Sequence, residues 1–271
     1  SSTTNLPRMP NHSKDFEQLL GGYFNSFYAD HPADATYVGL SSGEGRLNNV
    51  TLRALKHQHR QRQAALANLD TIAPSALSNE QNLDRLAFRA RLLREHEDFE
   101  RGRHTLDPSG IDAVFEFLLR ELQRGETHPK RAANNIRSLL VESKRYLNQA
   151  TKLIDRPERV WRNIMDETFK ASGSFFDAIT TFLEANGNKK EDSLLIRLAR
   201  RSCAKYHESV MGRRLAKPGS FAIGTAMLQR RIRDELGLDY TIGQVEAVAV
   251  AEIERVGALL KKASEKFGRN K

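Results

Sequence analysis

The sequence contains too few cysteines and too few long apolar runs for several common classes of protein. Among its 271 residues only Cys203 is a cysteine, which excludes an intramolecular disulfide and a cysteine-cluster zinc site. No stretch approaches the roughly 18 continuous apolar residues of a membrane span, and the polar first residues do not form a signal peptide. Two locations stay open: a soluble cytoplasmic protein, or an exported protein whose signal is already removed.

Patterns typical of β-strands are also absent. No run alternates apolar and polar residues between hairpin turns, whereas almost every segment has helical spacing. Several segments begin with a capping residue, such as Thr51, or the capping box of Ser78 and Gln81. We therefore predict an all-α array of about ten mostly antiparallel helices, without a sheet. The expected helices begin near Ser13, Pro32, Thr51, Ser78, Ile111, Thr127, Pro157, Glu191, Phe221 and Thr241.

The continuous helical pattern also predicts the domain organisation. Residues 1–12 are expected to form a disordered or extended tail, and residues 13–271 a single helical domain with a soft boundary near 215–220. Within the helices, Leu52, Leu83 and Leu86 are predicted to face the core. The polar run HQHRQRQ at 57–63 is predicted to face water.

Positive charge is in excess, but it does not form a stripe free of acids. Lysine and arginine number 43 against 34 aspartates and glutamates, which gives a net charge of +9. Acids follow the basic clusters closely: Glu95, Glu97, Asp98 and Glu100 follow four arginines, and the run 230–235 contains both signs. This pattern is typical of solvated helix faces with near-neighbour ion pairs. Aromatic residues have core spacing and do not alternate with basic ones, so we expect no nucleic-acid partner.

No catalytic or metal-binding motif is complete. A zinc peptidase helix needs His-Glu-x-x-His, which places two imidazoles on one face with a glutamate to activate the metal-bound water. His96 and His207 are each followed by glutamate, but Glu100 and Met211 stand where the second histidine is required. We expect both histidines to lie on the surface, and we assign no catalytic, cofactor-binding or metal-binding residue. Cys203, a single thiol on a helix, is expected to be a packing residue.

The last predicted helix is the segment least suited to a self-contained domain. Residues 247–251 are apolar on every side, and a helix that is apolar all round needs neighbours on all its faces. We therefore predict that this helix contacts a partner. The predicted partner interface comprises Val245, Val248, Val250, Ile253 and Val256.

Several motifs resemble one bacterial family, that of domain of unknown function 885. Residues 31–40, HPADATYVGL, resemble its P-x-x-A-T-x-x-G segment, and RPERVW at 156–161 is similar to its helical middle. Towards the C-terminus, GTAML at 224–228, GLDYT at 237–241 and EIERV at 252–256 resemble further family motifs. Complete members of this family resemble zinc metallopeptidases, with a His-Glu-x-x-His helix and a later glutamate ligand. The chain therefore resembles the N-terminal helical half of the family, and none of the zinc ligands can be assigned to its residues.

Three hypotheses follow. The resemblance implies the helical substrate-channel half of a metallopeptidase-like hydrolase, as a subunit, processed chain or fragment. Such a half would be inactive alone, would act on a peptide, and would need a partner segment that carries the zinc, with no cofactor in this chain. The alternative is a stand-alone all-α binding or scaffold protein without catalysis. A third hypothesis is an enzyme that uses the histidines and acids already present, which zinc titration of the isolated chain would test.

Overall fold

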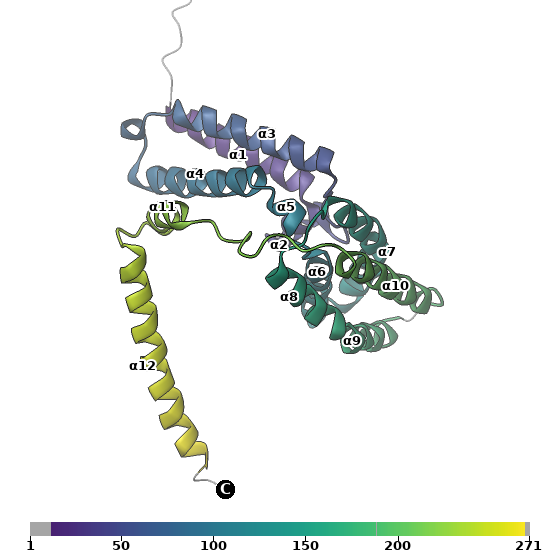
Figure 1. Ribbon diagram of the computed structural model, residues 1–271. Helices are drawn as coiled ribbons and strands as arrows, with labels where there is room; N and C mark the ends of the chain where they lie inside the picture. The colour runs from purple at the N-terminus through teal and green to yellow at the C-terminus, as the bar shows by residue number, and fades with distance from the viewer. Residues whose placement is uncertain (1–11, 188, 269–271) are drawn as a thin grey trace, which may run out of the picture.

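The computed structural model describes residues 12–187 and 189–268, and its architecture is all-α (Figure 1). Within these residues there are twelve α-helices, two short 3-10 helices and no strand. The predicted fold class is thus confirmed. Residues 1–11, which make up most of the predicted tail, lie outside the described part of the chain.

The helices follow one another through mostly short connections. In chain order they are α1 (His12–Asp30), α2 (Pro32–Tyr37), η1 (Ser41–Gly43), α3 (Leu52–Asp70), η2 (Pro74–Ala76), α4 (Asn79–Glu100), α5 (Arg103–Leu106), α6 (Gly110–Arg124), α7 (Pro129–Leu153), α8 (Arg159–Lys170), α9 (Ser172–Ala185), α10 (Asp192–Met211), α11 (Thr225–Leu236) and α12 (Ile242–Gly268).

Two local features raise the number of α-helices above the expected ten. Gly102 adopts a left-handed conformation, φ 70°, which ends α4 and allows the short helix α5 to start in a new direction. The helix expected from Pro157 is divided into α8 and α9 at Ala171, just before the weak helix formers Ser172 and Gly173.

The first group of helices comprises α1, α3 and α4, which pack around a core containing Phe16, Leu69, Phe88 and Leu92. The predicted cap at Thr51 and the capping box at Ser78 are both present. The prediction that leucines 52, 83 and 86 face the core is wrong, because all three are exposed. Helix α4 has apolar residues on two sides, and only the side that carries Phe88 and Leu92 meets α1 and α3.

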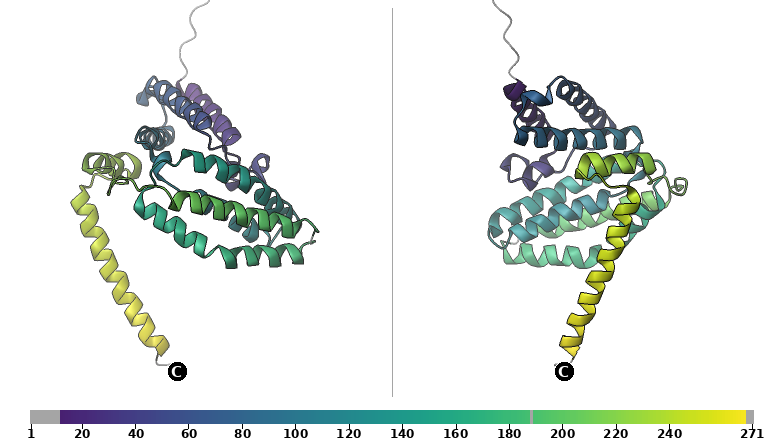
Figure 2. Two further views of the ribbon diagram at one scale, coloured as in Figure 1. Left: turned by 45° about the vertical axis from the view of Figure 1, so that its right-hand side comes forward. Right: turned by 90° about the vertical axis from the view of Figure 1, so that its left-hand side faces the viewer.

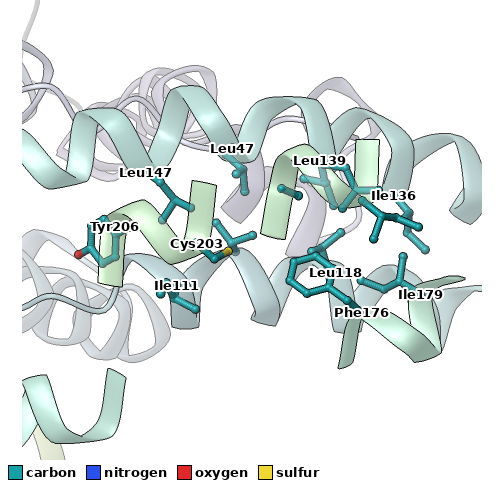
Figure 3. Close-up of a cluster of buried hydrophobic side chains, with 14 of the residues drawn as sticks. Leu47, Ile111, Leu118, Ile136, Leu139, Leu147, Phe176, Ile179, Cys203 and Tyr206 are labelled. Carbon is teal, nitrogen blue, oxygen red and sulfur yellow. The ribbon is translucent and has the colours of Figure 1, made fainter. Parts of the chain in front are cut away.

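The second group comprises α6 to α10 and contains the larger core, shown in Figure 3. Helix α7 packs against both α6 and α10, with Ile136 and Leu147 fully buried. Cys203 is buried among these side chains, as predicted, and burial raises the pKa of its thiol to about 12. Such a thiol stays protonated at neutral pH and is therefore unreactive in the folded protein.

A buried ion pair joins α7 to the start of α10. The Arg137 guanidinium donates to both carboxylate oxygens of Asp192, at 2.8 and 3.0 Å, and also to the Gly187 carbonyl oxygen. The backbone N–H of Lys189 donates to the same carboxylate at 2.9 Å. Both charged groups thus have hydrogen-bond partners in the second group, although almost no water reaches them.

The chain then returns to the first group through the connection between α10 and α11, which contains the expected soft boundary (Figure 1). Its path is fixed by the Ala216 N–H, which donates to the Pro157 carbonyl, and by Arg101, which donates to the Ala222 carbonyl. Helix α11 packs on α4, and α12 then projects away from both groups, as the two views in Figure 2 show. In the described part of the chain, no helix combines the length and the apolar character that a membrane span requires.

Candidate functional site

A cleft of about 560 Å³ lies where the two groups of helices meet. Its walls come from α1, α3, α4 and α5 on one side and from α6 and α7 on the other. Phe27, Phe99 and Tyr146 supply aromatic surface, and Arg62, Arg103 and Asp107 supply charge. The cleft is held in shape by α5, because the Asp155 N–H donates to the Thr105 carbonyl across the junction at 3.0 Å.

The charges of the cleft are paired with one another. Arg103 contacts Asp98 and Asp107, each at 3.2 Å, and Glu95 lies 2.9 Å from Arg91 and 3.7 Å from Arg62. Neither sign dominates, so the wall offers donors and acceptors side by side. The cleft therefore lacks the single-sign charge that a highly charged ligand would require.

Two ionisable groups of the cleft are held neutral by burial. Burial lowers the pKa of His104, so its imidazole is uncharged at neutral pH. Burial also raises the pKa of the Tyr146 hydroxyl to about 12. The cleft can therefore form neutral hydrogen bonds at these two side chains. The Ser109 hydroxyl, also in its wall, donates to Asp107, a carboxylate that is at the same time paired with Arg103.

Four aromatic rings are stacked in a column that leads from α3 and α4 to the cleft. His96 lies on His59 with 4.8 Å between ring centroids, His59 on Phe99 at 4.3 Å, and Phe99 on His104 at 4.8 Å. His59 is only 6 % exposed. Burial lowers the pKa of His59, and the neighbouring Glu100 carboxylate opposes this shift only in part.

The structure thereby corrects two predictions for these histidines. Within the run 57–63, Gln58, His59 and Arg62 are buried and do not face water. These three residues share one face of α3 at helical spacing, and this face meets α4. His96 is half-buried in the ring column. The other predicted surface residue, His207, is half-buried too, 2.7 Å from Asp166 and stacked on Phe169.

The acidic cluster on α4 is also not a solvated face. Glu97 contacts both Arg230 and Arg231 of α11, and Asp98 lies 3.0 Å from Arg231. Arg94 reaches Glu235 at 3.4 Å. These charged residues of α4 thus form ion pairs with charged residues of α11. This network of ion pairs holds α11 on α4.

We expect Arg231→Ala to loosen α11 without unfolding the two groups. The Arg231 side chain is mostly buried between Glu97 and Asp98, and its loss leaves Glu97 paired with Arg230 alone and Asp98 with Arg103 alone, a cost of about 1–3 kcal/mol. Amide hydrogen exchange in α11 should therefore become about tenfold faster or more. Arg233→Ala is the matched control, because the one ion pair that Arg233 forms within the described residues is with its neighbour Asp234 on the same helix. Equal exchange rates in both variants would contradict the role given to the network.

The five predicted interface residues all lie on α12, and four of them are exposed: Val248, Val250, Ile253 and Val256. Val245 is half-buried at the end nearest α11. Ile253 is 72 % exposed, and further along the helix Leu259, Leu260 and Phe267 are exposed as well. Val250 lies about 120° around the helix from Val256, so the apolar surface covers more than one side. The base of α12 is fixed by Gln229, which accepts from the Ile242 N–H and donates to the Tyr240 carbonyl.

Comparison with known proteins gives the family of this chain. Residues 32–271 match the model of the family described as "Bacterial protein of unknown function (DUF885)", and the chain belongs to this family. The resemblance of its motifs to the family is thus confirmed. No curated protein matches the chain significantly.

One solved structure has a similar fold. It is described as "The structure of a putative lipoprotein of unknown function from Shewanella oneidensis". The TM-score is 0.68 at 16 % sequence identity, and the match covers 93 % of this chain but only 48 % of that chain. The present chain thus spans about half the length of its structural neighbour.

The zinc site implied by the family resemblance does not fit the residues of this chain. No His-Glu-x-x-His motif is present, and only incomplete copies begin at His96 and His207. The His96 ring is stacked on His59, with 4.8 Å between the ring centroids. The His207 ring is hydrogen-bonded to Asp166. We therefore derive no catalytic step through such a zinc ion. Sequence reasoning missed the ring column and the cleft, although the spacing of His96 and Glu100, one helical turn apart, was a readable signal.

Proposed function

We propose that this chain is the helical, substrate-binding half of a metallopeptidase-like hydrolase, and that the catalytic residues belong to a further polypeptide segment. The segment would lie in the same chain or in a separate subunit. One observation carries the proposal: helix α12, 27 residues long, exposes apolar side chains along its length and contacts the rest of the described chain only at its base.

The apolar surface of α12 is unfavourable in water. Large exposed apolar patches of this kind mark sites of protein contact, because burying each square ångström of them gains roughly 25 cal/mol. The occupant we propose is the segment that corresponds to the remaining half of the Shewanella oneidensis neighbour. That neighbour is about twice as long and contains the present fold as one half, since the match covers 48 % of it.

The cleft supports the substrate-binding part of the proposal. It lies in the body of the helical half, its charges are paired, and its walls combine aromatic rings with hydrogen-bonding groups. An extended peptide presents carbonyl and N–H groups in alternation together with apolar side chains, and this surface is complementary to such a ligand.

A stand-alone binding or scaffold protein is the alternative, and the two proposals predict different compositions of the natural protein. Sequencing the gene beyond the codon for Lys271 and purifying the protein from its own bacterium should reveal a further segment with a His-Glu-x-x-His motif. The purified protein should cleave peptides and lose this activity when zinc is chelated. A monomer with the 30.7 kDa mass of this chain, and without peptidase activity, would overturn the proposal in favour of a scaffold.

A further inference from the structure

We propose that His59, His96 and Glu100 form a binding site for one divalent transition-metal ion, such as zinc, which links α3 to α4 beside the cleft. This site is separate from the catalytic zinc that the proposed function places outside the chain. One ligand atom from each of the three side chains can be chosen so that all lie within 4.8 Å of one another.

The two helices place these ligands on facing surfaces. His96 and Glu100 are four residues apart on α4, so they lie one above the other on the same face. His59 comes from α3, which packs directly against α4. Adjacent ligand atoms of a tetrahedral zinc ion are separated by about 3.3 Å, given bond lengths of 2.0–2.2 Å. A shift of the ligand atoms by about 1 Å would bring the three groups around one ion. One of the two imidazoles must also turn out of the stack, because their planes are only 9° apart and each lone pair lies in the plane of its ring.

The hydrogen-bonding state of His59 is the second observation. Although this side chain is almost completely buried, neither of its ring nitrogens has a hydrogen-bond partner among the described residues. The Glu100 Oε1 atom is only 2.7 Å from Nε2, but its direction does not satisfy hydrogen-bond geometry. The buried Nδ1 of His96 is likewise without a partner in the described chain. A metal ion would use imidazole lone pairs that are otherwise unsatisfied.

The charges around the site are compatible with a cation. Glu100 supplies one negative charge directly. Arg62, one turn further along α3, opposes a cation, but its guanidinium is directed to Glu95 at 3.7 Å. Two imidazoles and one carboxylate favour zinc and its transition-metal neighbours over calcium or magnesium, which prefer oxygen ligands alone. The Glu100 side chain is 57 % exposed, so an ion and a water ligand can enter from solvent.

Zinc titration of the untagged, chelator-treated chain tests the proposal. Isothermal calorimetry should show one zinc ion bound per chain, and zinc should raise the melting temperature. His96→Ala and Glu100→Gln should each weaken this binding at least tenfold. The control is His57→Ala, because His57 lies on the same helix, two residues from His59, but is exposed and points to Asp30 at 3.9 Å. This variant should bind zinc as the unaltered chain does.

Either of two results would overturn the site. One is the absence of saturable binding of one zinc ion to the folded chain. The other is unchanged affinity in both Glu100→Gln and His96→Ala, which would assign any binding to other histidines. Glu100→Gln keeps the shape of an exposed side chain, and circular dichroism checks that this variant is folded. The result does not depend on peptidase activity, so failure of the metal site and failure of the proposed function can be told apart.

Discussion

Replacing Asp192 by alanine is expected to lower the free energy of unfolding by about 3–5 kcal/mol. The substitution leaves the Arg137 guanidinium buried with only the Gly187 carbonyl and the Asn134 side chain to accept its hydrogen bonds. It also removes the acceptor of the Lys189 N–H. A buried cation without its counter-ion is among the most destabilising changes a single substitution can produce. Urea unfolding followed by circular dichroism measures the difference.

The control for Asp192 is an ion pair with similar chemistry on the protein surface. Glu252 pairs with Arg255 on α12, where both side chains are exposed, and Glu252→Ala should leave the midpoint of urea unfolding unchanged. The pH dependence provides a second readout. Hydrogen bonding from Arg137 lowers the pKa of Asp192, so its contribution is present above the unfolded pKa near 3.9 and is lost as the pH falls through the folded pKa.

The unaltered chain should therefore lose stability on acidification more steeply than Asp192→Ala, and the two curves should approach each other below about pH 4. A loss of less than about 1 kcal/mol at pH 7 would contradict the structural importance of the pair.

Replacing Ile253 and Val256 by glutamate is expected to weaken binding of the catalytic segment at least about 100-fold. Each substitution places a charge where the proposed interface buries an apolar side chain, and 100-fold corresponds to about 2.7 kcal/mol. The measurement is the dissociation constant between the chain and the separately produced segment, by calorimetry. Ile253 and Val256 are exposed in the isolated chain, so the double substitution should leave its own stability within about 0.5 kcal/mol.

Ala258→Glu supplies the matched control for this interface. Ala258 lies two residues beyond Val256, about 200° around the helix, so the same charge is added on the opposite side. This variant should bind nearly as well as the unaltered chain. Equal weakening by both changes would point to a general charge effect, and no weakening by either would remove α12 from the interface.

Much of the fold was predictable because helical signals are local. The capping box at Ser78 and Gln81 and the break at His31 and Pro32 depend on residues close in sequence, and the structure confirms both. The exposure of Val248 and Val250 was also predictable, because residues 247–251 are apolar on every side of one helix and such a helix needs neighbours on all its faces.

What sequence reasoning missed depends on which helices become neighbours. Leu83 and Leu86 share a side of α4 with Ala90 and Leu93, which reach α11, but α11 does not extend far enough to cover the two leucines. The pairing of Glu97 with Arg230 joins residues 133 positions apart, so near-neighbour patterns cannot show it. His59 looks like part of a polar run, and only the position of α4 makes it a buried residue.

The most direct test of the account is the solvent accessibility of α12 in the natural protein. Hydroxyl-radical footprinting of Ile253, Leu260 and Phe267 should be compared between the isolated chain and the protein purified from its bacterium, with Val141 on α7 as an exposed reference. We predict strong protection of the three α12 residues in the natural protein and unchanged modification of Val141. Equal modification of α12 in both samples would show that no polypeptide covers this helix, and would contradict the central claim.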